Sequence, residues 1–284
     1  MRPAFLLWSL VYLTLWTSAQ ALKICAFNVR SFGETKANNK KVMDLLTKII
    51  ARCDLCLVQE VRDAKGEAIP TLVRELNRHE KSTGKMFGLL FSFILSKYKS
   101  EIFISTFRTF LSLKVIFQGD TRLIFFLTCN IVCSLFPTVV KDFILVGQHT
   151  CPKNAMKEID ELYSVFQEIS KKWKNQVKNY NVMFLGDLNA ACSYVTAKGW
   201  MNVRLRNDPK FHWLIGDEED TTVRENTRCA YDRLAEEHTS ILCLHVDAGT
   251  SPFQLEQEAL EISDHYPVEV DLKPSHRYLL RNEL

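Results

Sequence analysis

Residues 184–195 read FLGDLNAACSYV, and they begin inside an apolar run. The run, Val182–Leu185, has the length and composition of a buried strand, and it continues directly into Gly186. Asp187 and Asn189 follow with one residue between them. Gly-Asp and Asn are ordinary turn formers, so this stretch alone fits a turn. Its interpretation depends on whether other strands of the chain end in the same way.

The rest of the chain alternates between strand and helix patterns. Strands are predicted in residues 22–27, 55–58, 139–149, 181–187, 241–247 and 264–272. Helices are predicted where apolar residues recur at helical spacing, in residues 41–50, from Pro70 onward, and in 156–173. Because strands and helices interleave, we expect an α/β or α+β fold with strands buried on both faces.

The composition is that of an ordinary folded protein. Of 284 residues, 47% are apolar and 24% are charged, and ten glycines with eight prolines exclude a collagenous or low-complexity chain. The formal net charge of +3 permits contact with an acidic polymer but does not predict one. Since no repeat or linker divides the chain, we expect one domain over 22–273 with a tail at 274–284.

The first 21 residues have the pattern of a secretory signal. Arg2 is their only charge, Ala4–Trp16 is apolar, and Ala19-Gln20-Ala21 is the small-x-small pattern that signal peptidase cuts. The alternative is a membrane anchor, but the apolar run is shorter than the ~20 residues that a span needs. We therefore expect cleavage before Leu22, secretion and no stable membrane association. The final Arg-Asn-Glu-Leu faintly resembles a signal for retention in the endoplasmic reticulum.

Nine cysteines remain after the expected cleavage. They are Cys25, Cys53, Cys56, Cys129, Cys133, Cys151, Cys192, Cys229 and Cys243. In an oxidising compartment some of them should be paired, and the odd count leaves at least one thiol free. Cys53 and Cys56 have CxxC spacing without a second CxxC or His pair. A buried thiol at Cys56 is therefore favoured over metal or redox chemistry.

Chemically capable side chains lie at the ends of several of the predicted strands. Asn28, Glu60, His149, Asp187 and Asn189 follow their strands, and the Asp264-His265 pair lies beside the final strand. In α/β folds ligand sites form where strand ends meet their loops, so one such ending fits a turn, whereas several predict a site. The carboxylates of Glu60, Asp187 and Asp264 are hard ligands suited to Mg²⁺ or Mn²⁺. The asparagines can orient a phosphate or a water, and the histidines can carry protons near neutral pH.

The motifs that are missing also narrow the chemistry. There is no nucleophile elbow, which argues against a covalent acyl mechanism. There is no P-loop and no GxGxxG turn, which argues against nucleotide-driven chemistry. Hydrolysis of a phosphoester by metal-activated water fits these residues best.

Six segments of the chain together resemble the deoxyribonuclease I family. They are LKICAFNVRSFGETK, CDLCLVQEVRD, GDLNAACSYV, VRLRNDPKFHWLIGDEEDTT, CAYDR and ISDHYPVEV. The resemblance covers about residues 22–78, 139–233 and 255–272. It implies a four-layer αββα sandwich of two mixed sheets and a monomeric endonuclease that hydrolyses DNA. The implied cofactors are Mg²⁺ or Mn²⁺, with Ca²⁺ as structural support, and actin is a possible partner.

The resemblance also implies a role for each matched residue of the centre. It implies that Glu60 binds the metal together with Asn28 and Asp264. Asp187 and Asn189 are implied to take part in catalysis. Without the resemblance, Glu60 can be interpreted simply as a surface residue that follows a strand.

Two histidines and an arginine carry further implied roles. His149 and His265 resemble the catalytic pair, with Asp232 of CAYDR orienting His265. Arg62 resembles an arginine that contacts phosphate, a role suited to its fixed fork of donors. The plainer alternatives are a core histidine at 149 and a helix N-cap at Asp264-His265.

Two structural features are implied as well. Cys192 and Cys229 match a family disulfide, with ~3–4 kcal/mol of stabilisation if it is unstrained; otherwise they are free buried thiols. The residues that resemble a calcium-binding loop are Asp220, Thr222 and Thr227. Glu225 and Arg228 depart from that loop's pattern.

Residues 79–138 do not resemble the family. Here the family carries a glutamate that pairs with the histidine at position 149 and an arginine that contacts phosphate. In this chain the segment is rich in Phe, Leu and Ile, and Glu101 and Asp120 are its only acids between Lys81 and Val140. Glu101 is a weak candidate for the partner of His149. The segment must supply at least two core strands if the fold is complete.

The expectation from the sequence is therefore a secreted, divalent-metal-dependent endonuclease of DNA. Two alternatives stay open. One is a catalytically impaired relative that binds DNA or a protein partner, since residues 79–138 are divergent. The other is a phosphoesterase of the same superfamily that acts on lipid or inositol phosphates.

Overall fold

The computed structural model describes most of the chain outside its two ends. The described residues are 22–82, 87–96, 99–106, 112–117, 123–128, 142–173, 181–237, 243–248 and 256–272. The predicted signal, residues 1–21, and the tail, residues 274–284, lie outside them. Within the described part, none of the helices combines the length and the hydropathy that crossing a membrane requires.

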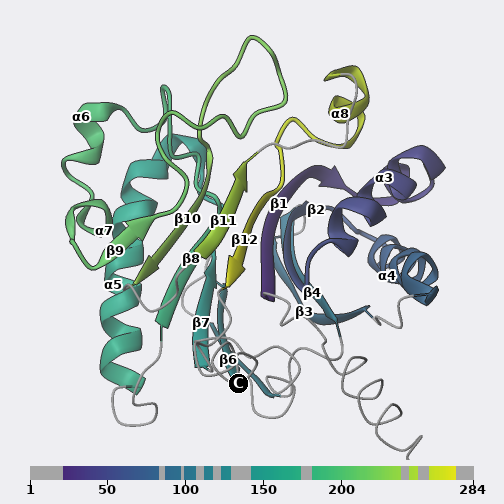
Figure 1. Ribbon diagram of the computed structural model, residues 1–284, viewed down its shortest axis with the longest axis horizontal. Coiled ribbons are helices and arrows are strands. Elements are labelled where there is room, and N and C mark those ends of the chain that lie inside the picture. Colours follow the sequence, from purple (N-terminus) through teal and green to yellow (C-terminus); the bar gives the residue numbers. More distant parts are fainter. Residues whose placement is uncertain are drawn as a thin grey trace, which may run out of the picture.

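Two six-stranded sheets form the centre of the molecule (Figure 1). The first sheet, in spatial order, is β11 (Cys243–Ala248), β12 (Val268–Leu272), β1 (Leu22–Phe32), β2 (Leu55–Val61), β4 (Lys99–Thr106) and β3 (Phe87–Ser96). The second sheet is β5 (Ser112–Phe117), β6 (Leu123–Thr128), β7 (Asp142–Gly147), β8 (Asn181–Asp187), β10 (Asp232–Glu237) and β9 (Phe211–Trp213). The pairs β1–β2 and β7–β8 are parallel and the other pairs are antiparallel, so both sheets are mixed.

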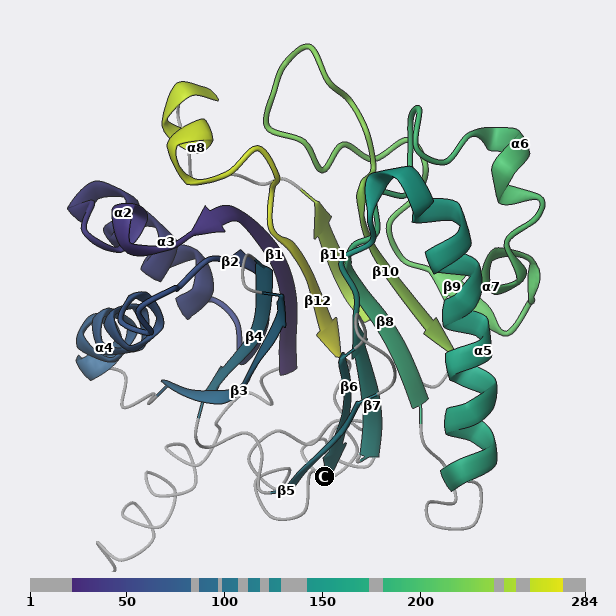
Figure 2. The ribbon, with the colours of Figure 1, turned by 180° about the vertical axis from the view of Figure 1, so that it is seen from behind.

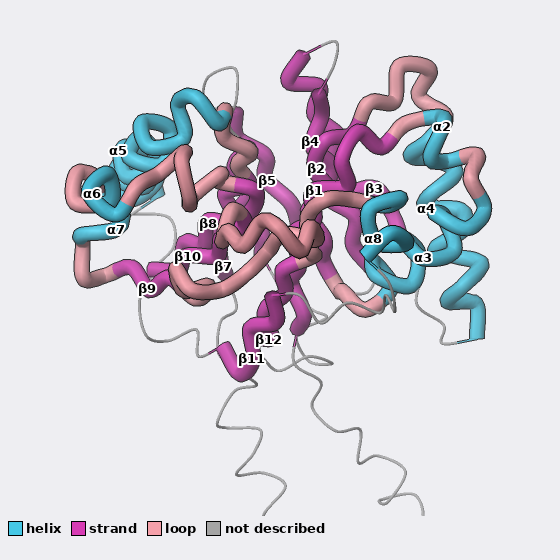
Figure 3. The backbone as a smooth tube through the Cα atoms, turned by 90° about the horizontal axis from the view of Figure 1, so that it is seen from above, coloured by secondary structure: helices cyan, strands magenta, loops and turns pink. Residues whose placement is uncertain are grey.

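Helices cover the outer face of each sheet (Figures 2 and 3). Those beside the first sheet are α2 (Glu34–Ala37), α3 (Lys40–Ala51), α4 (Ala68–His79) with the short η1 (Glu80–Ser82), and α8 (Glu256–Ile262). Those beside the second sheet are η3 (Pro152–Asn154), α5 (Ala155–Trp173), α6 (Ala197–Trp200) and α7 (Arg204–Asn207). The four-layer αββα sandwich expected from the sequence is confirmed.

The core follows from the strand alternation. Along β1, Leu22, Ile24 and Ala26 face the second sheet and pack with Leu145 and Met183. The alternate residues of β1 pack instead against α3 and α4. Both faces of the strand are thus buried, as its apolar pattern predicts.

The local signals account for the helices. In α3, Val42, Leu46 and Ile49 are buried on one face, and the Asn39 side chain accepts a hydrogen bond from the Val42 N–H at 3.3 Å. An Asn at this position satisfies one of the free N–H groups of the first turn. The long helix predicted at 156–173 is α5, Ala155–Trp173.

Residues 79–138 complete both sheets. They contribute β3 and β4 to the first sheet and β5 and β6 to the second, which exceeds the two strands required of them. Glu101 lies in β4 opposite Phe93, but its side chain lies outside the described part of the structure. Its pairing with His149 therefore stays a prediction. The strand β10 was not predicted from the sequence.

Two disulfides are present among the described cysteines. Cys192–Cys229 matches the pairing that the resemblance implied, and Cys25–Cys53 joins β1 to the turn before β2. Cys56 is a buried free thiol, as expected, and burial raises its pKa to about 12. Cys53 therefore belongs to a disulfide and not to a CxxC metal site.

Candidate active site

The strand order brings chemically capable residues to one end of the sandwich. Because β1 is parallel to β2 and β7 is parallel to β8, their carboxyl ends point the same way within each sheet. The antiparallel strands β10 and β12 begin at that end, so Asp232 lies directly opposite Asp187. In Figure 1 this is the upper end, where the β1 arrow has its head.

Asp187 is the centre of the cluster. Its Oδ2 accepts a hydrogen bond from Asn28 Nδ2 at 2.9 Å and lies 3.3 Å from His149 Nε2 and 3.7 Å from His265 Nε2. Its Oδ1 accepts the backbone N–H of Asn189 at 3.0 Å. Burial raises the pKa of Asp187, but the charges of the two histidines and the bond from Asn28 outweigh it and hold the pKa well below its usual range.

Asp232 and His265 form a buried pair. His265 Nδ1 lies 2.7 Å from Asp232 Oδ2, and the Asp232 backbone N–H donates to Thr221 Oγ1 at 3.1 Å. Burial lowers the pKa of His265, but the charges of Asp232 and Asp187 overcome this and raise it to about 10. Burial raises the pKa of Asp232. With Nδ1 engaged, the other ring nitrogen of His265 is left to face Asp187.

Glu60 lies beside this cluster and not apart from it. Its Oε1 accepts from Asn28 Nδ2 at 3.3 Å and lies 3.9 Å from His149 Nε2, and its Oε2 accepts the Ser31 N–H at 3.2 Å. Glu60 has a φ of 60°, which is strained for a residue other than glycine. Asn28 thus bridges the carboxylates of Glu60 and Asp187, one from each sheet.

Two glutamines that the sequence did not single out hold the sheets together here. Gln59 Oε1 accepts the Asp187 N–H at 2.8 Å, and Gln59 Nε2 donates to the backbone oxygen of Gln148 at 3.0 Å. Gly186 must lack a side chain, because a Cβ there would lie 2.4 Å from that same oxygen and its φ is 129°. In the sequence, the only sign of this close contact was the glycine at position 186, which ends an apolar run directly before Asp187.

Asp264 and Arg62 lie further out. Asp264 Oδ2 is 3.8 Å from Arg30 Nε, and the Asp264 backbone oxygen accepts the Val223 N–H. Arg62 is exposed and its backbone N–H donates to Phe32 O at 2.6 Å. Asp264 thus lies next to His265 in the chain and beside Arg30, and neither Asp264 nor Arg62 has a described contact with Asp187.

The donor set suits a divalent cation. Among the described residues, ligand atoms of Asp187, Asp232 and His265 lie within 4.8 Å of one another, and Asp232 Oδ1 is a buried acceptor without a hydrogen-bond partner. Glu60 adds a third carboxylate, partly exposed, beside Asp187. Since carboxylate oxygens are hard ligands of the kind that divalent cations prefer, Asp187, Asp232 and Glu60 fit such an ion.

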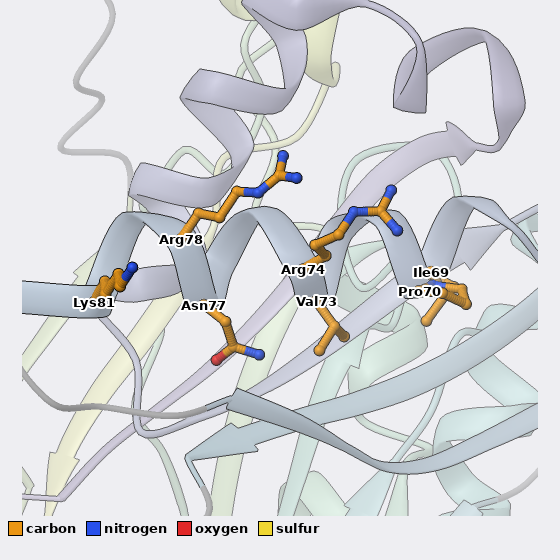
Figure 4. A pocket seen from close by; sticks show the side chains of 7 residues that line it. All are labelled: Ile69, Pro70, Val73, Arg74, Asn77, Arg78 and Lys81. Atoms are coloured by element: carbon orange, nitrogen blue, oxygen red, sulfur yellow. The ribbon is translucent and has the colours of Figure 1, made fainter.

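A cavity of about 680 Å³ lies elsewhere, along α4 (Figure 4). It is lined by Ile69, Pro70, Val73, Arg74, Asn77, Arg78 and Lys81. None of these residues was predicted to belong to the site, and α4 covers the outer face of the first sheet. The chemistry is therefore assigned to the strand-end cluster and not to this cavity.

Comparisons with known proteins place the chain in a family. The family model described as "Endonuclease/Exonuclease/phosphatase family" matches residues 25–265. Human deoxyribonuclease gamma is 39% identical over 92% of this chain and 89% of its own length. Pig deoxyribonuclease-1 is 38% identical over 96% of this chain and 99% of its own length. The chain belongs to the deoxyribonuclease I family.

Solved structures show the same fold at low sequence identity. The catalytic domain of human Nocturnin with bound sulfate has a TM-score of 0.58 at 10% identity, over 89% of this chain and 93% of that one. A D. rerio TDP2 complexed with a single-strand DNA product has a TM-score of 0.55 at 16% identity, over 89% and 98%. At these identities the likeness establishes the sandwich architecture alone.

The segment that resembles the calcium loop of the deoxyribonuclease I family is closed by its own hydrogen bonds. Asp220 Oδ1 accepts from the Thr222 N–H at 2.9 Å, from Thr222 Oγ1 at 2.6 Å and from the Cys229 N–H at 3.3 Å. Thr222 Oγ1 also contacts the backbone oxygen of Thr227. Arg228 Nε lies 3.9 Å from Asp220 Oδ2. The three predicted residues are thus close together, and calcium binding by them stays a prediction.

Proposed function

We propose that this chain is a secreted endonuclease that hydrolyses phosphodiester bonds of DNA with the help of a divalent metal. The relatives named deoxyribonuclease support the substrate and the reaction. The observation that carries the proposal is the convergence on Asp187 Oδ2 of Asn28, His149 and His265, with Glu60 joined to the same cluster through Asn28.

In this proposal Glu60 holds a Mg²⁺ or Mn²⁺ ion, with Asn28 and Asp264 beside it. When bound, the metal supplies positive charge that stabilises the transition state at the phosphate. The Ser31 N–H and Asn28 each donate to one oxygen of the Glu60 carboxylate, which fixes its orientation beside the cluster. Arg62 and Arg30 are exposed nearby and are suited to the phosphates of a bound strand.

The two histidines share the proton transfers. Asp232 holds His265 by Nδ1, so His265 acts at Nε2, and His149 also presents Nε2 to Asp187. Asp187 keeps both rings oriented, and Asn189 supports Asp187 through its backbone N–H. A histidine acid or base of this kind typically contributes ~10²–10⁴-fold to the rate.

Secretion rests on two independent features. The first 21 residues have a signal pattern, and the described part of the chain contains two disulfides, which persist in oxidising compartments. We expect the protein recovered from the medium of producing cells to begin at Leu22. Intact Met1 on the recovered protein would contradict this expectation.

The test of activity is the nicking of supercoiled plasmid in Mg²⁺ and Ca²⁺, with EDTA as the control. Nicking that EDTA abolishes supports the proposal. Retention of DNA without cleavage would instead favour a catalytically impaired binder. Release of phosphate from inositol phosphates, with intact plasmid, would favour a phosphoesterase acting on those compounds.

A further inference from the structure

A strained bulge interrupts β1 beside the candidate site. Arg30 and Ser31 have φ values of 43° and 60°, and the β1–β2 register shifts between Asn28 and Phe32. Left-handed backbone at two consecutive residues other than glycine persists only when its surroundings hold it in place. The contacts that stabilise this bulge therefore also determine the positions of the side chains that the bulge contacts.

Lys36, in the short helix α2, makes those contacts. Its Nζ donates to the backbone oxygens of Val29 at 2.8 Å and Arg30 at 2.6 Å, and also contacts the backbone oxygen of Ile262. An ammonium group has three donors, so three carbonyl oxygens satisfy all of them. Burial, followed by the neighbouring charge of Arg30, lowers the pKa of Lys36 to about 8. The ammonium group of Lys36 thus binds backbone carbonyls and not a carboxylate.

The bulge that Lys36 holds makes direct contact with the proposed metal side of the site. The Ser31 N–H donates to Glu60 Oε2 at 3.2 Å, and the Arg30 N–H donates to Asn28 Oδ1 at 2.9 Å. Both N–H groups belong to the two residues with left-handed backbone, so their directions depend on the conformation of the bulge. A change in the bulge would therefore turn the supports of Glu60 and Asn28 away.

The third carbonyl connects Lys36 to the histidine side of the site. Ile262 precedes Ser263, whose Oγ donates to Asn28 O at 2.6 Å and accepts the His265 N–H at 3.1 Å. Lys36 thus joins the bulge in β1 to the loop that carries His265. These two segments are more than 200 residues apart in the sequence.

We propose that Lys36 is a positioning residue, which sets the orientation of Glu60 and of the Ser263–His265 loop by tying three backbone carbonyls together. The proposal rests on the proposed function for its consequence in catalysis, but its geometric content does not depend on DNA. Lys65 differs from Lys36 in this respect, because its ammonium group is exposed and pairs with the carboxylate of Glu34.

The test compares Lys36→Met with Lys48→Met, an exposed lysine on α3. Amide hydrogen exchange reports the positioning directly, because the Ser31 and His265 N–H groups have the partners given above. We expect both amides to exchange faster in Lys36→Met while the amides of α3 keep their wild-type protection. We also expect Mn²⁺, titrated as the probe without DNA, to bind about 10-fold more weakly, the usual cost of losing an outer-shell support.

Lys36→Gln is the second variant, because its amide retains two donors for the carbonyls. Lys36→Gln should recover part of the Mn²⁺ affinity and part of the protection of the Ser31 amide. If Lys36→Met does not fold, the same two measurements on Lys36→Gln test the proposal. Unchanged exchange at Ser31 and His265 with a merely lower melting temperature would overturn the proposal. Wild-type protein that binds Mn²⁺ but leaves plasmid intact would instead overturn the proposed function and leave the exchange result standing.

Discussion

Asp187 and Asp232 occupy directly opposed positions on the antiparallel strands β8 and β10, and the His265 ring contacts both carboxylates. Two buried acids in neighbouring positions repel each other unless a positive charge or a proton lies between them. The imidazolium of His265 supplies that charge, at 2.7 Å from Asp232 and 3.7 Å from Asp187. His265 thus stabilises the pair of aspartates and also takes part in the proposed proton transfer.

Replacing His265 by Ala should therefore damage activity and stability together. Plasmid nicking should fall by at least the ~10²–10⁴-fold that a histidine acid or base contributes. The free energy of unfolding should fall by about 3–5 kcal/mol, because the change leaves the buried carboxylate of Asp232 without its charged partner and removes one of the two histidines beside Asp187. Nicking assays and urea denaturation measure the two effects, with His212→Ala on the exposed face of β9 as the matched control. A fully active variant would remove His265 from the mechanism.

The pH dependence of stability follows from the same ring. The pKa of His265 is raised from 6.5 to about 10, so the folded state holds this proton more tightly than the unfolded state. Its contribution to the free energy of unfolding is complete below about pH 6.5 and is lost as the pH rises through about 10. Denaturation of wild type and His265→Gln at several pH values measures this contribution as their difference. A difference that stays constant from pH 6.5 to 10 contradicts the assignment.

Glu60→Gln tests the metal side of the cluster. The amide keeps the size of the side chain and an oxygen for the Ser31 N–H, but it loses the charge that the proposed Mg²⁺ requires. We expect the Mg²⁺ concentration for half-maximal nicking to rise by about 10-fold or more. Glu168→Gln, which changes an exposed carboxylate on α5, serves as the control. Equal Mg²⁺ requirements in Glu60→Gln and wild type would show that Glu60 does not hold the metal.

Much of this arrangement could be predicted from strand ends. Apolar runs predicted β1, β2, β7, β8 and β12, and the polar residues beside the ends of these strands were expected to meet because ligand sites form where strand ends and loops gather in such folds. The strand β10 was missed because DRLAEE has no apolar alternation, although Glu236 is buried in it. Asp232 and Arg233 of this strand were recognised only as part of the CAYDR motif.

Other features had no signal in the sequence at all. Gln59 and Gln148 contact each other across the two sheets, and no motif marks a glutamine that bridges strand ends. The Cys25–Cys53 bridge was missed because cysteine spacing does not determine pairing. The role of Lys36 depends on a bulge, and the LKICAFNVRSF segment reads as a regular strand. Contacts between segments far apart in the chain are set by the assembled fold and not by local pattern.

Gly186→Ala tests whether the close approach of the two sheets positions Asp187. A Cβ at this position would lie 2.4 Å from Gln148 O and 2.7 Å from Gln59 Nε2, and the φ of 129° is strained for alanine. We expect a loss of about 1–3 kcal/mol in the free energy of unfolding from the backbone alone. The Gln59 bond to the Asp187 N–H should also break, so nicking should fall even well below the melting temperature.

Gly216→Ala is the matched control for that substitution. The nearest atom to its Cβ would be Glu219 Cγ at 3.9 Å, an ordinary contact, and its φ is not positive. Its stability and activity should therefore remain close to wild type. If Gly186→Ala behaved like this control, the packing of Gly186 against Gln148 would not be what holds Asp187 in place, and the orientation of the cluster would have to come from β10 and His265 alone.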